Sequence, residues 1–294
     1  MKKPTTFDEQ LQLLESRGLV IGNDDKCLDF LRSTNYYRLT AYLLPFKQDD
    51  DTYLPGITFE RIHQIYEFDR KLRILLFSAI EEIELFLRTQ LAYYSAHTHG
   101  VLAYLDEKRY NDRHDHEKFM CAIDAAISNH KNTLIVKHHK AAYSGAFPIW
   151  VIVEFLSIGN LSYLYADWLK DDKKRVAKDL FSTTYPFLDS WMKCITVLRN
   201  RCAHYSRLYY TRFTDMPRIP PTVEYECTGR VFDQLLMLKF LYAHKHKWNT
   251  SFVVPLETLV GEYQDSVDFK HIGFPENWLE LLQHSEKRLK GVTE

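Results

Sequence analysis

The stretch FERIHQIYEFDRKLRILLFSAIEEIELFLRTQLAYY, residues 59–94, decides the fold of this chain. Its apolar residues recur at mostly three- and four-residue steps, the spacing that places side chains on one face of an α-helix. The residues of this stripe are Phe59, Ile62, Tyr66, Leu72, Leu76, Ile80, Ile83, Leu87, Leu91 and Tyr94. The sequence therefore predicts one long amphipathic helix of about 35–40 residues, frayed ends included.

The segments on either side also carry helical signals. Further helices are expected at 7–17, as two short helices within 24–46, and at 112–139, 149–168 (kinked near Gly159), 171–180, 229–245, 255–263 and 275–290. Pro186 suits the first position of another helix, with a stripe that runs to Tyr205. Loops are expected at 48–56 and 209–223. No stretch has strand periodicity, so we predict an all-α helical bundle with an N-terminal helical appendage (1–57), a core (58–250) and C-terminal helices (251–294).

Composition and charge narrow the function classes. The 294 residues are 46% hydrophobic and include only 10 Gly and 10 Pro, which argues against a disordered chain and against a turn-rich β-sandwich. With 38 Lys+Arg against 39 Asp+Glu the net charge is −1, so any nucleic-acid site must be local. The chain has five cysteines, an odd number, and no two of them form a Cys-x-x-Cys pair. This cysteine usage favours a reducing cytoplasm. We expect no signal peptide and no membrane span, because Glu154, Asn160 and Asp167 interrupt the most apolar segment.

One short segment combines residue types that can do acid–base chemistry on a phosphate. It is LRNRCAHY, residues 198–205. Asn200 and His204 are four residues apart and therefore neighbours on a helix, so Asn200 could orient the imidazole. His204 can give or take a proton near neutral pH, and Arg199 can bind phosphate oxygens. Because the ribose 2′-OH can act as the nucleophile, these groups suffice for metal-independent RNA cleavage. The alternative is that His204 merely caps the helix.

Basic and aromatic residues interleave around this segment. Arginines outnumber acids between residues 199 and 218, where Asp215 is the one acid. This pattern is typical of a strip that binds single-stranded RNA. The proposed RNA-binding residues are Arg201, Tyr205, Arg207, Tyr209 and Arg212, together with Tyr37 and Arg38 from the N-terminal unit. For the N-terminal tyrosines, packing against the core is the competing interpretation.

Several other residues admit a structural or a functional interpretation. Glu84 and Arg88, four apart on the long helix, are either a structural ion pair or a support that borders His204 and positions Arg199 or Asn200. Cys202 lies on the apolar stripe and is expected in the core. Three histidine pairs lack metal-ligand spacing and are interpreted as solvated: 114/116, 138/139 and 244/246. No cofactor fingerprint is present, so we expect neither a metal nor a cofactor.

The motif and its neighbours resemble a known family. The run from Arg199 to His204 resembles the Arg-polar-x-x-x-His motif of HEPN ribonucleases, and most of the chain resembles the abortive-infection Abi-D/F group (the Abi_2-like family). The resemblance is carried by NYYRL (35–39), FDRKLR (68–73), AIEEIE (79–84) with Arg88, PIW (148–150) and residues 198–208. Ala41 departs from the family, where glycine often follows the Tyr-Tyr-Arg-Leu run.

The resemblance implies an all-α HEPN core and a ribonuclease that acts as a toxin or in phage defence. It also implies an active site assembled across a homodimer and control by a partner, for this group a small structured RNA. A dimer follows from the chemistry as well, because one His204 per chain supplies one proton-transfer group while cleavage needs a donor and an acceptor. The alternative function is a non-catalytic RNA-binding protein that sequesters a cognate RNA or a partner.

Overall fold

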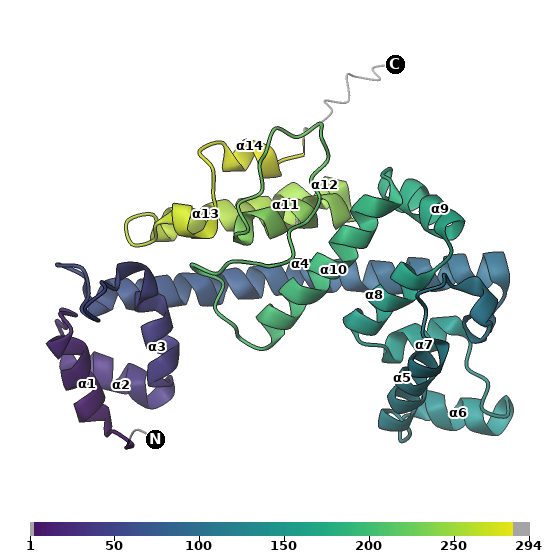
Figure 1. Ribbon diagram of the computed structural model, residues 1–294, viewed down its shortest axis with the longest axis horizontal. Helices are drawn as coiled ribbons and strands as arrows, with labels where there is room; N and C mark the ends of the chain where they lie inside the picture. The colour runs from purple at the N-terminus through teal and green to yellow at the C-terminus, as the bar shows by residue number, and fades with distance from the viewer. Residues whose placement is uncertain (1–2, 285–294) are drawn as a thin grey trace, which may run out of the picture.

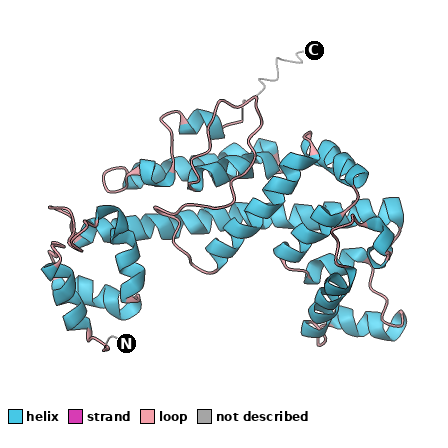
Figure 2. Cartoon of the chain, in the orientation of Figure 1, coloured by secondary structure: helices cyan, strands magenta, loops and turns pink. Residues whose placement is uncertain are grey.

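A computed structural model describes residues 3–284 as an assembly of helices around one long helix (Figures 1 and 2). No strand forms within these residues, and only isolated β-bridges such as Val20–Thr58 occur. The all-α prediction is confirmed. The α-helices are α1 (Phe7–Ser16), α2 (Asp24–Ser33), α3 (Tyr36–Leu43), α4 (Phe59–His99), α5 (His116–Asn129), α6 (Leu134–Ala142), α7 (Ile149–Phe155), α8 (Ile158–Asp167), α9 (Lys170–Phe181), α10 (Tyr185–Ala203), α11 (Val231–Leu241), α12 (Lys245–Trp248), α13 (Val254–Tyr263) and α14 (Trp278–Leu282). Short 3-10 turns occupy Leu44–Phe46, Ala103–Leu105, Glu107–Arg109 and Phe269–Ile272, and a π-helical turn occupies Asn249–Val253.

The long helix α4 is the axis of the molecule. It has 41 residues, which at 1.5 Å per residue is roughly 60 Å of helix. The Thr58 hydroxyl caps its first turn by accepting from the Arg61 N–H at 3.1 Å, and Gly100, with φ of 101°, ends it. The predicted apolar stripe is buried along most of its length, from Phe59 to Leu91.

The other helices are distributed along α4 (Figure 1). The helices α1–α3 lie at its N-terminal end, α5–α9 gather at its C-terminal end, and α11–α14 cover its middle. Helix α10 crosses α4 and also packs on α8, α9 and α11. The buried apolar residues of all these elements form one continuous core. The division of the chain into an N-terminal appendage, a core and C-terminal helices stays a prediction.

Two predicted helices are each divided in the structure. The segment predicted as one helix over 112–139 forms α5 and α6, because the polar run from Ser128 to Thr133 favours caps and turns over helix interior. The kink expected near Gly159 lies earlier, at Ser157, whose hydroxyl accepts from the Asn160 N–H and starts α8. Pro186 lies one position after the first residue of α10.

The C-terminal helix is shorter than predicted within the described residues. Helix α14 ends at Leu282, with Gln283 in an extended conformation. Residues 285–290 of the predicted helix lie outside the described part of the chain. Within residues 3–284, no helix combines the length and apolarity needed to cross a bilayer.

The buried face of α4 should dominate stability. Leu76 is fully buried on this face, whereas Leu134 on α6 is 86% exposed. We expect Leu76→Ala to lower the free energy of unfolding by about 2–5 kcal/mol, because it leaves a cavity in a packed core. The matched substitution Leu134→Ala should change it by less than about 0.5 kcal/mol. Urea denaturation followed by circular dichroism measures both, and equal effects would contradict this arrangement.

Candidate active site

The segment singled out by the sequence lies at the C-terminal end of α10, where it crosses α4 (Figure 1). His204 is the C-cap, and its N–H donates to the Asn200 carbonyl at 3.0 Å. Tyr205 then adopts a left-handed conformation with φ of 56°. Its N–H donates to the Cys202 carbonyl at 3.2 Å, and the Ser206 N–H donates back to the Arg201 carbonyl at 2.9 Å. This pair of bonds is a Schellman ending, which turns the chain sharply away from the helix axis. His204 therefore sits at an abrupt helix end rather than within a turn of helix.

The residues of this segment differ in burial, so some belong to the core and others can contact a ligand. Leu198 and Cys202 are in the core, as predicted for Cys202, and burial raises the pKa of the Cys202 thiol to about 12. Asn200 and His204 are exposed. Within residues 3–284, no hydrogen bond joins the Asn200 side chain to the His204 ring, so the orienting role of Asn200 stays a prediction.

Arg199 is held against α4. Its Nε lies 3.5 Å from Glu84 Oε2, which is ion-pair distance without hydrogen-bond geometry. Its guanidinium carbon lies 5.9 Å from the centre of the Phe77 ring. The Arg199 side chain remains 34% exposed, so these contacts orient it without enclosing it. A phosphate can therefore still reach the guanidinium.

Glu84 and Arg88 form an ion pair, and their role as a support of a site stays a prediction. Arg88 is buried, donates to the carbonyls of Val153 and Leu156, and is paired with Glu84. It thus satisfies carbonyls at the end of α7, which is a structural role. Glu84 in turn lies between Arg88 and Arg199, so one carboxylate joins the structural cation to the chemically available one.

A buried ion pair fixes the chain immediately after His204. Asp69 is fully buried on α4 and pairs with Arg73 one turn later. Its carboxylate also accepts from the N–H groups of Leu208 (3.1 Å) and Tyr209 (2.8 Å), and from the hydroxyl of Tyr42 at 2.6 Å. These bonds tie α3, α4 and the segment that follows α10 to one carboxylate.

No individual role for Asp69 or Arg73 was predicted from the sequence. The available signal was two opposite charges, four residues apart, next to the apolar stripe between Tyr66 and Leu76. Charges at such positions are rarely buried unless paired.

The N-terminal unit also contacts this segment. Arg38 donates to the Tyr205 carbonyl at 2.5 Å, and Arg207 donates to the Ala41 carbonyl while its guanidinium lies over the Tyr42 ring. Burial lowers the pKa of Arg207. Both arginines therefore contribute to holding the turn after His204.

The remaining predicted RNA-binding residues divide by exposure. Tyr37 is 75% exposed and Tyr205 is 69% exposed, and Arg212 is exposed as well. Arg201 is partly exposed and lies 5.1 Å over the buried Phe213 ring. Tyr209 differs from the prediction: it is fully buried and its hydroxyl bonds His271 Nδ1 at 2.7 Å, so its ring cannot stack on a base.

A groove opens beside the helix end. Its volume is about 450 Å³ and its walls come from α4 and the end of α10: Arg70, Arg73, Ile74, Phe77, Cys202, Ala203 and Tyr205. Ile74 and Phe77 are exposed there, and Leu85 continues the same face of α4. The site is thus a shallow, partly apolar surface with cations at its edge.

The histidine pairs are less solvated than their sequence suggests. His114 has a side chain only 2% exposed, bonds Asp167 Oδ2 at 3.0 Å and stacks on Tyr110. His139 is also buried. Both are core-edge residues, which corrects the solvated interpretation. No group of three potential ligands with metal-site geometry occurs within residues 3–284.

Comparison with known proteins shows similarity to a family. The family model described as "Abi-like protein" matches residues 29–210, more than half of the chain. The match includes Asp69, Arg73, Glu84, Arg88 and the segment from Arg199 to His204. No curated protein and no solved structure is significantly similar to the chain.

The Asp69 cluster should be a major determinant of stability. Asp69→Ala leaves the Arg73 charge and two backbone N–H groups buried without their partner, so the free energy of unfolding should fall by about 3–5 kcal/mol. Asp29→Asn, which removes an exposed pair with Arg32, should cost less than about 1 kcal/mol. Urea denaturation compares the two.

A double variant separates the ion pair from the loop anchor. Asp69→Leu with Arg73→Met removes both charges, yet the N–H groups of Leu208 and Tyr209 stay unsatisfied. We expect only partial recovery of stability. Full recovery would show that Asp69 does not anchor the segment after His204.

Proposed function

The chain belongs to the Abi-like family, and from this premise we propose that it is a metal-independent endoribonuclease of the HEPN type that acts as a toxin or abortive-infection effector. The observation that carries the proposal is the helix end itself. Arg199 and His204 are both reachable by solvent, Arg199 is held by Glu84, and the groove beside them carries the exposed ring of Tyr205. These features suit a flexible single strand better than a small enclosed substrate.

The proposed reaction is attack of the ribose 2′-OH on the adjacent phosphorus. The 2′-OH loses its proton to a base, the bond from phosphorus to the 5′-oxygen breaks, and that oxygen takes up a proton. His204 carries one of these protons, and Arg199 stabilises the charge that develops on the phosphate oxygens. The products are a 2′,3′-cyclic phosphate and a 5′-hydroxyl.

Two proton transfers require two groups, and one chain supplies one His204. We therefore propose a homodimer with a composite site, in which a two-fold axis brings both copies to one cleft. The apolar face of α4 next to the groove supports this arrangement: Ile74 is 59% exposed and Leu85 is 53% exposed on the same side of the helix. Exposed apolar residues contiguous with a site are typical of an interface.

RNA is the proposed partner in two respects. It is the substrate, and a small structured RNA is the proposed regulator, as the family resemblance implies. The exposed residues Tyr37, Tyr205, Arg201 and Arg212, with Arg38 at their edge, are the proposed contacts. Tyr209 is left out because it is buried.

The first test removes the proton-transfer group. His204→Ala should lower RNA cleavage by about 10²–10⁴-fold and abolish toxicity in cells, because general acid–base catalysis is lost. His138→Ala removes another exposed histidine and should leave cleavage unchanged. Cleavage is measured on purified protein with a chelator present, and the products are analysed for 2′,3′-cyclic phosphate. Wild-type protein that binds RNA without cleaving it would favour the sequestration alternative.

The second test addresses the dimer. Ile74→Glu places two charges near the proposed two-fold axis, so sedimentation should shift from dimer to monomer. Cleavage should fall by up to about 10²–10⁴-fold, the contribution of one acid–base group. Leu134→Glu, on the exposed side of α6, is the matched control and should change neither property. A fully active wild-type monomer would overturn the composite site.

A further inference from the structure

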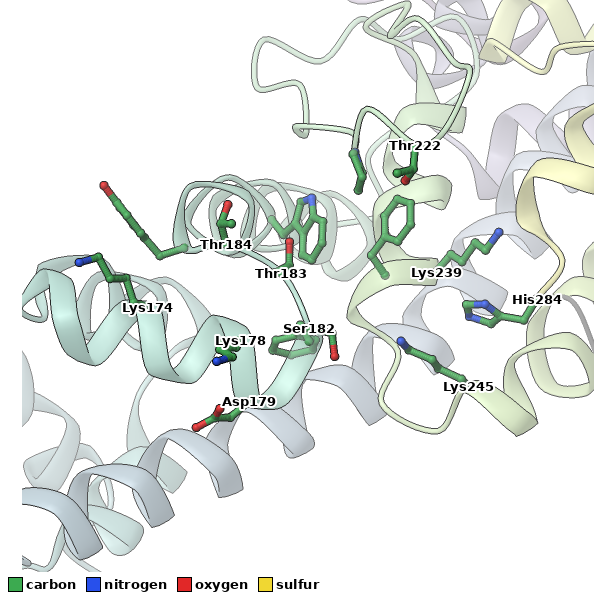
Figure 3. Close-up of a pocket in the computed structure, with 15 residues that line it drawn as sticks. Lys174, Lys178, Asp179, Ser182, Thr183, Thr184, Thr222, Lys239, Lys245 and His284 are labelled. Carbon is green, nitrogen blue, oxygen red and sulfur yellow. The ribbon is translucent and has the colours of Figure 1, made fainter. Parts of the chain in front are cut away.

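A second pocket of the described chain lies at the other end of α10 (Figure 3). It has a volume of about 910 Å³ and lies where the corner between α9 and α10 faces α11, α12 and His284. Helix α10 has 19 residues, so this pocket is roughly 28 Å of helix away from His204. It is therefore separate from the proposed RNA-cleavage site.

The charge of the pocket is unbalanced. Lys174, Lys178, Lys239 and Lys245 line it, against one carboxylate, that of Asp179. Lys174 is paired with Asp171, whereas Lys178 and Lys245 have no ion pair within residues 3–284. In Figure 3, Lys239, Lys245 and His284 gather on one side of the hollow, and Lys178 and Asp179 come from α9 on the other. Cations that line a cavity with so little compensation favour an anionic ligand.

At the pocket, one polar group is buried without a partner, and a second, exposed one makes no capping bond. The Nε2 atom of His284 is buried and has no hydrogen-bond partner in the described chain. Burial and the neighbouring Lys239 and Lys245 lower the pKa of His284. At the opposite wall, the Thr184 hydroxyl makes no capping bond to the first turn of α10. A ligand that brings hydrogen-bond acceptors and negative charge could bind both the His284 ring and the Thr184 hydroxyl.

The floor of the pocket is aromatic. Trp191 and Phe240 stack with ring centres 5.4 Å apart and an angle of 11° between planes, and Phe240 is partly exposed. A flat apolar platform beside a cluster of cations matches the two halves of a nucleotide, the base and the phosphate. The volume is also within the range of pockets that hold small molecules.

We propose that this pocket binds a nucleotide unit, with its base against Phe240 and its phosphate between Lys178 and Lys245. The unit comes either from a free mononucleotide or from one residue of an RNA strand. The proposal does not depend on the nuclease activity, because none of the pocket residues belongs to the cleavage motif.

Titration calorimetry on the full chain tests this proposal. The probes are AMP, ATP, adenosine, inorganic phosphate and a six-residue 2′-O-methyl oligoadenylate, which cannot be cleaved through its 2′-oxygen. AMP, ATP or the oligonucleotide should bind more tightly than adenosine or phosphate alone, because neither of those contains both halves. If a mononucleotide binds, the source is the free nucleotide, whereas binding of the oligonucleotide alone assigns the pocket to RNA.

Variants locate the binding. Lys178→Gln with Lys245→Gln should weaken it at least about tenfold, since two charge contacts to phosphate are lost. Lys247→Gln, an exposed lysine of α12 outside the pocket, is the control and should bind as wild type does. Phe240→Leu should weaken the nucleotide and leave phosphate binding unchanged. Binding of no probe at millimolar concentration, or equal binding by the Lys178/Lys245 variant, would overturn the proposal, whether or not His204 supports cleavage.

Discussion

The Asp69 carboxylate is the point on which the arrangement of this protein depends. It is fully buried, and burial raises the pKa of Asp69 by disfavouring the charged carboxylate. Arg73, the Tyr42 hydroxyl and two backbone N–H groups compensate it. The compensating groups come from three places, α3, the next turn of α4 and the chain after α10, so the carboxylate is satisfied only when all three are in place.

This constraint explains how a helix end becomes a defined site. A C-terminal helical turn usually frays. Here the turn after His204 is held on several sides, by the Schellman bonds, by Asp69 through Leu208 and Tyr209, and by Arg38 through the Tyr205 carbonyl. The bulky Tyr205 is kept at a positive φ, which costs of order 1 kcal/mol or more and persists only where neighbouring contacts determine the backbone. The exposed His204 imidazole is therefore attached to a turn whose backbone is held by several contacts.

The two ends of α10 face different environments. Its C-terminal end carries the segment from Arg199 to His204 beside the apolar face of α4, and its N-terminal end borders a basic, aromatic pocket. The helix between them is anchored by Trp191, Ile195 and Leu198, which are buried. Glu84 makes a second such connection on α4. It pairs with Arg88, which supports α7, and lies at ion-pair distance from Arg199. Structural and candidate functional groups are therefore joined through single carboxylates.

The sequence by itself determined the helical class, the long helix α4 and the placement of Arg199 and His204 at a helix end. These features follow from periodicity and caps, which act over a few residues. It also placed Glu84 and Arg88 together, since helix geometry makes residues four apart neighbours. Only the tertiary structure decided that Tyr209 turns inward to His271 while Tyr205 stays exposed, that His114 is buried, and that Asp69 reaches a segment about 140 residues later. It alone assembled the basic pocket from segments that are far apart in the sequence. Such outcomes depend on which helices meet, and the pattern within one helix does not encode the surface of its neighbour.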